Sequence, residues 1–292
     1  MGSRLSAPGP QERRFAAYIE GLAIAAGHED RQAPLKSYCK GLLLPGERKS
    51  IEPMAARLDP ENIQPMRQSL HHLVAKAPWN DEVLLEQVRN YVLPTMQKQG
   101  PVVAWIVDDT GFPKKGKHSV GVTRQYCGQV GKQDNCRVAV SLSVATWNSS
   151  LPSAYRLYLP KEWAEDAERR KKTEVPEEVE FQTKPEIALD QIRAAVAANV
   201  DRGVVLADAA YGINTEFRDG LMELGLRPAI CCGRAKLDDS LGAGQTAATS
   251  KTPRKNGTTS AAIAKEHGPS ARLGQTVGVK AALHCLQGNR LA

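Results

Sequence analysis

The chain has 292 residues, of which 41% are hydrophobic and 24% charged, and its formal net charge is +7. These values are those of a globular chain long enough for ample core, which excludes wholesale disorder. No apolar run approaches the roughly 18 residues that a membrane span needs, and the N-terminus lacks an apolar signal region, so we expect a cytoplasmic protein with no membrane partner.

The positive charge is concentrated at one end of the chain. Of the 39 Lys and Arg residues, nine lie in residues 233–292, against three of the 32 Asp and Glu residues. Residues 1–232 are therefore nearly balanced, and the net charge alone is weak support for nucleic-acid binding by the folded part. The six cysteines include no Cys-x-x-Cys pair, and reduced thiols are expected. A zinc site of His118, Cys127 and Cys136 fits no familiar ligand spacing.

Residues 12–100 are predicted to be helical, after a disordered N-terminus of residues 1–11. Apolar residues recur there at steps of three and four, which predicts helices over residues 12–26, 34–44, 51–58, 65–77 and 81–93. One interpretation is a supporting helical layer. The other is a DNA-binding domain, which would present Arg48, Lys49, Arg57, Arg67 and His71. No helix-turn-helix signature decides between them.

From residue 101 the pattern changes to strands, and we expect one domain over residues 101–232. An unbroken apolar run over residues 102–107 predicts a buried strand that ends at Asp108 and Asp109, where Gly111 and Pro113 are expected to break it. A polar hairpin region follows over residues 116–133. Strands are predicted over residues 135–146 and 153–159, and the three strands should form an antiparallel meander.

The second half of this domain alternates helices and strands. A charged helical excursion over residues 160–172 and an acidic connector over residues 173–184 are followed by a helix over residues 186–200, which begins after Pro185. A short buried strand over residues 203–208 ends at Asp208, and Tyr211 and Gly212 are expected to turn the chain. Asn214 or Thr215 should cap a helix over residues 216–224, before a last strand over residues 226–231.

This order predicts an α/β fold of the ribonuclease-H-like class. Three antiparallel strands, followed by parallel strands with connecting helices, form its mixed sheet, in which the first and fourth strands are neighbours. Asp108 and Asp109 would then meet Asp208 at one edge of the sheet. The alternative for any one of these acids is a solvated junction between a strand and a turn.

Converging carboxylates suit a hard divalent cation, Mg²⁺ or Mn²⁺. Such ions activate a nucleophile and stabilise the leaving oxygen in phosphoryl transfer. Four nearby cations could hold DNA phosphates without reading sequence: Lys114, Lys115, Lys117 and Arg124. For each of these cations, a solvated surface residue is the alternative. Walker A, dinucleotide-binding and Gly-x-Ser-x-Gly motifs do not occur.

Residues 233–292 differ from the rest of the chain. They contain eight glycines and no Phe, Tyr, Trp or Met, and they show no sustained periodicity. Such a segment buries too little apolar surface to offset its ordering entropy, so disorder is predicted. A basic nucleic-acid-binding arm is one interpretation, and an out-of-frame or decayed coding region is the one we favour.

Several motifs in one order resemble bacterial insertion-sequence transposases of the Asp-Asp-Glu type. The motifs are Asp-Asp-Thr-Gly-Phe-Pro-Lys-Lys-Gly (108–116), Arg-Gln-Tyr-Cys-Gly (124–128), Asn-Cys-Arg-Val-Ala-Val-Ser-Leu (135–142), Arg-Leu-Tyr-Leu-Pro (156–160) and Val-Leu-Ala-Asp-Ala-Ala-Tyr-Gly (205–212). They are similar to the group numbered seven hundred and one, which is related to the IS-four group. The resemblance covers most of residues 12–231. It implies a ribonuclease-H-like core, a divalent metal, and cutting and joining of double-stranded DNA at terminal inverted repeats.

The resemblance also assigns positions. Asp109, before the Thr, resembles the first catalytic and metal-binding acid and Asp208 the second, with Asp108 as an adjacent candidate. Ala210 stands where the family usually has Gly. The family's third acid is a Glu far downstream, and Glu266 matches no such context, so this copy is expected to be incomplete and inactive. The resemblance is compatible with a homodimer on DNA and a bacterial, nucleoid-associated location. The alternative is a non-catalytic DNA-binding protein that acts through its helical N-terminal region.

Overall fold

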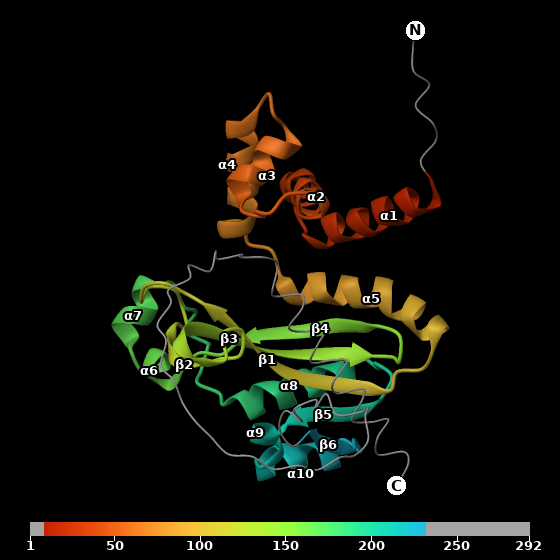
Figure 1. Ribbon diagram of the computed structural model, residues 1–292, viewed down its shortest axis with the longest axis vertical. Helices are drawn as coiled ribbons and strands as arrows, with labels where there is room; N and C mark the ends of the chain where they lie inside the picture. Colours follow the sequence, from red (N-terminus) through yellow and green to blue (C-terminus); the bar gives the residue numbers. More distant parts are fainter. Residues whose placement is uncertain (1–8, 232–292) are drawn as a thin grey trace, which may run out of the picture.

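A computed structural model describes residues 9–231 of the chain (Figure 1). In residues 9–231, five helices precede a six-stranded sheet, and the other five helices lie between strands in the chain. The mixed α/β class that the sequence predicts is therefore confirmed. The disorder predicted for residues 233–292 falls outside the described residues. None of the helices in residues 9–231 is both long enough and apolar enough to cross a membrane.

The first five helices follow the predicted apolar periodicity. They are α1 (Pro10–Ala25), α2 (Glu29–Leu43), α3 (Ile51–Leu58), α4 (Ile63–Ala75) and α5 (Asp81–Gln99). The predicted end of α5 near Leu93 is wrong, because the helix continues through Pro94 to Gln99. Leu93 and Met96 are buried in the core of the sheet, and this burial favours the extra turn in spite of the proline. α5 lies between the sheet and helices α1–α4 (Figure 1).

The sheet contains β1 (Ala104–Pro113), β2 (Thr123–Cys127), β3 (Lys132–Ala145), β4 (Ser150–Leu157), β5 (Val204–Asp208) and β6 (Pro228–Cys231). β1 pairs antiparallel with β3 and parallel with β5, and β5 pairs parallel with β6. β3 is long enough to take two partners along its other edge. It pairs with β2 over its first residues and with β4 from Ala139 onward.

β1 does not stop where the sequence predicts. The expected break at Gly111 and Pro113 is wrong, since β1 stays paired with β3 as far as Pro113, opposite Cys136. At Gly111 a Cβ atom would lie only 2.8 Å from Sγ of Cys127 and 3.1 Å from its Cα atom. Glycine therefore stands here because β2 passes close to β1, and it does not mark a strand end.

Five further helices connect or follow the strands. They are α6 (Lys161–Ala164), α7 (Ala167–Lys172), α8 (Lys184–Ala197), α9 (Ala209–Gly212) and α10 (Thr215–Glu223). The turn predicted at Tyr211 and Gly212 is instead the short helix α9, and Asn214 caps α10 by accepting a hydrogen bond from the backbone N–H of Phe217 at 2.7 Å. The main core lies on one face of the sheet, where Trp105 and Val107 pack with residues of α5, α8 and α10.

Candidate active site

The predicted acids lie on two adjacent strands, just beyond the last paired residues, Ile106 of β1 and Leu206 of β5. Asp108 and Asp109 follow the four buried residues that open β1, and Asp208 is the last residue of β5, which pairs parallel with β1. Side chains alternate between the faces of a strand. Asp109 therefore lies on the face of Trp105 and Val107, towards α8. Asp108 and Asp208 lie on the face of Ile106 and Leu206, which form a second, smaller cluster.

Each carboxylate oxygen of Asp109 accepts a hydrogen bond from a different side chain. The Lys184 Nζ atom lies 2.7 Å from Oδ2, and the hydroxyl of Tyr211 donates to Oδ1. The side chains of Lys184 and Asp109 are each 29% exposed, so the ion pair is sheltered but still reaches solvent. Each carboxylate oxygen of Asp109 thus has one protein donor.

Lys184 is held in place by the start of α8. Thr183 and Glu186 form a capping box, with the Thr183 hydroxyl accepting from the Glu186 N–H and the Glu186 carboxylate accepting from the Thr183 N–H. Pro185 in the first turn stabilises the same helix start. The ammonium also lies 5.5 Å from the ring centroid of Tyr158, within the range of a cation–π contact.

Tyr211 connects the two acid positions. Oδ1 of Asp208 caps α9 by accepting from the N–H groups of Ala210, at 2.9 Å, and Tyr211, at 3.2 Å. This short helix directs the buried Tyr211 side chain back to Asp109, and its ring packs against Phe217 with 5.7 Å between centroids. Burial and the negative charge of Asp109 raise the pKa of Tyr211 above its ordinary value, so the hydroxyl remains a donor.

Asp108 lies on the other face, where the residue reaches solvent although protein groups surround much of its carboxylate. Its Oδ1 atom accepts from the Asp109 N–H at 2.8 Å, and its carbonyl accepts from the Ser141 hydroxyl at 3.1 Å. Desolvation by the surrounding protein, together with the charges of Asp109 and Asp208, raises the pKa of Asp108 to about 6. Negative charge is therefore crowded at this edge of the sheet.

The chemistry of these donors fits a hard divalent cation. Carboxylate oxygens are preferred ligands of Mg²⁺, which is commonly held by one or two carboxylates together with substrate phosphates. Desolvation is the main cause of the raised pKa of Asp108, and the charges of Asp109 and Asp208 add to it; a bound cation would offset that part of the effect. Within residues 9–231, no group of three or more His, Cys, Asp or Glu side chains is arranged to hold a metal ion. The described donors thus fit a site of two carboxylates completed by other ligands.

The four predicted phosphate ligands lie around the loop between β1 and β2 and on β2 itself. Lys114, Lys115, Lys117 and Arg124 are all exposed. The loop backbone is fixed from two sides. Nδ2 of Asn135 donates to the carbonyls of Lys114 and Gly116 at 2.7 and 2.8 Å, and Arg169 donates to the carbonyl of Lys117 at 2.8 Å. The lysine side chains therefore extend into solvent from a loop whose backbone is held by hydrogen bonds from Asn135 and Arg169.

The cations of the helical region are partly used within that region. Arg57 donates to the carbonyl of Arg48 at 2.8 Å, Lys49 donates to the carbonyl of Leu44, and Nε of Arg67 donates to the side-chain oxygen of Gln64 at 3.0 Å. These contacts give Arg57 and Lys49 a structural role in the loop before α3. Arg48 and His71 are exposed.

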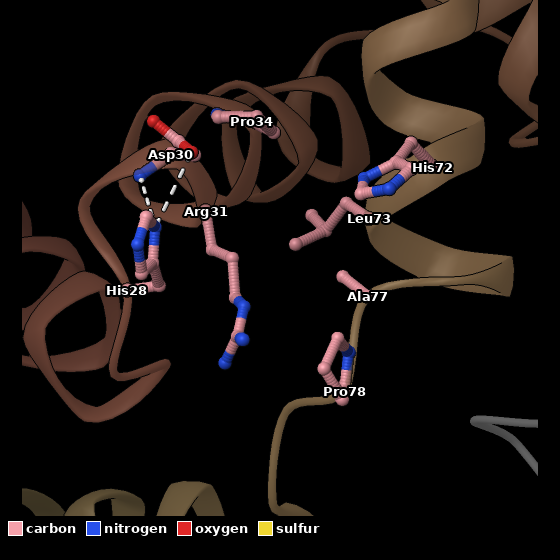
Figure 2. A pocket seen from close by; sticks show the side chains of 8 residues that line it. All are labelled: His28, Asp30, Arg31, Pro34, His72, Leu73, Ala77 and Pro78. Carbon is pink, nitrogen blue, oxygen red and sulfur yellow. Dashed lines mark hydrogen bonds and ion pairs between the residues drawn. The ribbon is translucent and has the colours of Figure 1, made fainter.

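A hollow of about 230 Å³ lies in the helical region (Figure 2). It lies between the start of α2 and the end of α4, and it is lined by His28, Asp30, Arg31, Pro34, His72, Leu73, Ala77 and Pro78. Arg31 donates to the carbonyl of Ala26 at 2.9 Å, and His28 pairs with Asp30. None of the three predicted acids lines this hollow.

The cysteines of the rejected zinc interpretation are buried. Cys127 and Cys136 are free thiols that pack with Val138, and burial raises the pKa of Cys136 to about 11. His118, by contrast, is exposed.

Sequence reasoning did not single out Lys184 or Tyr211 as site residues. The signals available were a lysine at the first position of a capped helix and a tyrosine three residues after a strand-end acid. Neither signal indicates a partner, because the contacts to Asp109 join residues 75 and 102 positions apart.

The sequence is similar to a family model and to a known protein. A family model described as DDE superfamily endonuclease matches residues 20–267. A protein of Microchaete diplosiphon named "Probable transposase for insertion sequence element IS701" is 32% identical over 146 residues, which are 50% of this chain and 35% of that protein. The matched stretch thus spans about a third of the relative's length.

Proposed function

Since this chain belongs to the DDE superfamily endonuclease family, we propose that it is a transposase acting on double-stranded DNA at the terminal inverted repeats of a mobile element. The reaction of such a protein is metal-dependent cleavage and strand transfer by phosphoryl transfer. The observation that carries the proposal is the placement of Asp108, Asp109 and Asp208 on the adjacent parallel strands β1 and β5, just beyond the last paired residues of the two strands.

The proposed fold is ribonuclease-H-like. Its support is a sheet in which an antiparallel β1–β3–β4 unit is extended by the parallel strands β5 and β6, with α8 and α10 as the connections. In such open sheets, ligands bind at the carboxyl ends of parallel strands. The helical region of residues 12–100 and the catalytic region of residues 101–232 are the two proposed domains.

The residues of the proposed site would bind the metal, position its ligands or contact phosphates. Asp109 and Asp208, with Asp108 as the adjacent candidate for the first position, would hold Mg²⁺ or Mn²⁺, which when bound activates the attacking hydroxyl and stabilises the leaving oxygen. Tyr211 orients Asp109, and the Asp208 cap of α9 orients Tyr211. Lys114, Lys115, Lys117 and Arg124 would contact phosphates without reading bases.

Catalytic competence is a separate part of the proposal. The described residues supply two acid positions, one on β1 and one on β5, and they contain no group of three or more His, Cys, Asp or Glu that could hold a metal ion. We propose that this chain binds the element's ends but does not cut them by itself. A homodimer on the DNA and a nucleoid-associated location would accompany this function.

The experiment compares two duplexes of equal length, one from an end of the element and one of unrelated sequence, with and without Mg²⁺. We expect tighter binding of the end duplex, dependence on the metal, and no strand cleavage. Equal affinity for both duplexes would reject the proposed function. Cleavage that disappears in Asp208→Asn would reject only the proposed incompetence.

The same assay identifies the alternative function. In a non-catalytic DNA-binding protein, the affinity for DNA would not change with the metal or with Asp108→Asn and Asp208→Asn. It would be lost when Arg48 and His71 are replaced by Ala. Arg48, in the loop before α3, and His71, in α4, are both exposed, so their replacement tests the surface and not the packing.

A further inference from the structure

Lys184 occupies a place beside Asp109 that a bound cation would also require. Its ammonium lies 2.7 Å from Oδ2 of Asp109, and both side chains are less than one-third exposed. A lysine ammonium is a compact charge on a flexible stem, and such a charge competes directly with a metal ion for a carboxylate. The structure therefore shows Asp109 neutralised by the protein itself.

The acids on the opposite face are not neutralised in this way. Among residues 9–231, neither Asp108 nor Asp208 forms an ion pair with Lys, Arg or His, whereas Asp109 does. The edge thus has two different halves. One half is an acid held by an ammonium and a hydroxyl, and the other is a pair of acids whose charges repel each other.

Lys184 also has a second position available without unfolding its helix. Its backbone is fixed by the capping box of Thr183 and Glu186, so a change of partner needs only side-chain rotation. The ammonium already lies 5.5 Å from the centroid of the Tyr158 ring, whose face can hold a cation. Tyr211 would continue to hold Oδ1 of Asp109 while Oδ2 changes its partner.

We propose that Lys184 is a positioning residue with two alternative partners: it neutralises Asp109 in the metal-free protein, and it turns to a DNA phosphate oxygen when a divalent cation takes that carboxylate. This inference rests on the proposed function, because it concerns the same carboxylates. It adds that the metal site is self-inhibited by a lysine of α8, so metal and DNA bind cooperatively.

The first test is calorimetric titration of Mn²⁺ into the purified chain without DNA. Removing a competing, partly exposed ion pair by Lys184→Met should tighten Mn²⁺ binding about fivefold. Lys184→Arg keeps the charge and should stay within about twofold of the wild type. Lys171→Met is the matched control, since Lys171 is an exposed lysine of α7, and it should change nothing. Unchanged or weaker binding by Lys184→Met would overturn the inference.

The second test uses the wild-type chain, so it does not depend on the folding of a variant. Lysine amines are acetylated briefly with an N-hydroxysuccinimide ester and quantified by mass spectrometry. Mn²⁺ should accelerate acetylation of Lys184 several-fold relative to Lys171, because the ammonium leaves Asp109. Equal labelling of Lys184 with and without Mn²⁺ would contradict the exchange of partners.

Failure of this inference can be told apart from failure of the proposed function. If the wild type binds Mn²⁺, loses it in Asp208→Asn and gains nothing from Lys184→Met, only the role of Lys184 is rejected. If neither the wild type nor Lys184→Met binds Mn²⁺, both the role of Lys184 and the proposed metal site are rejected.

Discussion

Removal of the Tyr211 hydroxyl is the substitution that most directly tests the link between the two acid positions. Tyr211→Phe deletes a donor to the Asp109 carboxylate and keeps a ring that is only 2% exposed and packs on Phe217. Because the ring remains, the substitution creates no large cavity, and the loss is that of a single hydrogen bond to a charged group.

The expected cost follows from that hydrogen bond. A hydrogen bond to a charged group contributes about 1.5–3 kcal/mol, and leaving a carboxylate oxygen without its donor costs a similar amount. The Asp109 side chain is 29% exposed and keeps Lys184, so water replaces part of the loss. We expect a destabilisation of about 1–2 kcal/mol, which lowers the melting temperature by about 2–8 °C.

The assay is thermal unfolding followed by circular dichroism. Tyr91→Phe is the matched control, because its hydroxyl donates to the carbonyl of Arg14 at 2.7 Å from a side chain that is 37% exposed. That neutral and accessible hydrogen bond should contribute about 0.5 kcal/mol or less. In an Asp109→Asn background, Tyr211→Phe should cost less than in the wild type, since the charge is gone. A Tyr211→Phe protein as stable as the wild type would refute the reasoning.

Three further predictions concern stability. The pKa of Asp108 is raised to about 6, so the folded protein binds this proton more tightly than the unfolded chain, and the stability that the proton provides is lost as pH rises from about 4 to 6. Asp108→Asn should remove this loss and stabilise the protein at pH 7 by about 1 kcal/mol or less after solvent screening. Urea denaturation of the wild type and of Asp108→Asn at pH 4 and pH 7 tests this prediction. The same dependence of stability on pH in the two proteins would disprove it. Gly111→Ala places a Cβ atom 2.8 Å from Sγ and 3.1 Å from Cα of Cys127. This substitution should lower the free energy of unfolding, measured by urea denaturation, by about 1–3 kcal/mol. A change within about 0.5 kcal/mol would show that β2 can shift at little cost. Asn214→Ala removes the cap on the Phe217 N–H and should cost about 1 kcal/mol, whereas Asn214→Ser should retain most of the stability in the same calorimetric scan.

The local features of the fold were largely readable from the sequence. Pro185 predicted the start of α8, and the apolar steps of α3 gave its bounds as Ile51–Leu58. The predicted break of β1 at Gly111 and Pro113 was wrong, because the sequence does not distinguish a glycine required by a close tertiary contact from a glycine that ends a strand. α5 ran past Pro94 for the same kind of reason, since burial of Met96 outweighs a local preference.

The candidate site was predictable only as a set of acids. Strand-end positions indicated Asp108, Asp109 and Asp208, because residue type and the end of an apolar run are local signals. The partners of Asp109 were not predictable, since Lys184 and Tyr211 reach it through tertiary structure across 75 and 102 residues. The different faces of Asp108 and Asp109 follow from strand alternation, but only once the continuation of β1 past both residues is known.

The central claim is that Asp108 and Asp109 of β1 and Asp208 of the adjacent strand β5 form one divalent-cation site. Calorimetric titration of Mn²⁺ into the wild type and into Asp208→Asn tests it most directly, because asparagine caps a helix about as well as aspartate and so preserves α9. The account predicts saturable binding by the wild type and at least about tenfold weaker binding by Asp208→Asn, as expected when a carboxylate ligand of a hard cation is removed. Equal affinity in the two proteins would contradict it.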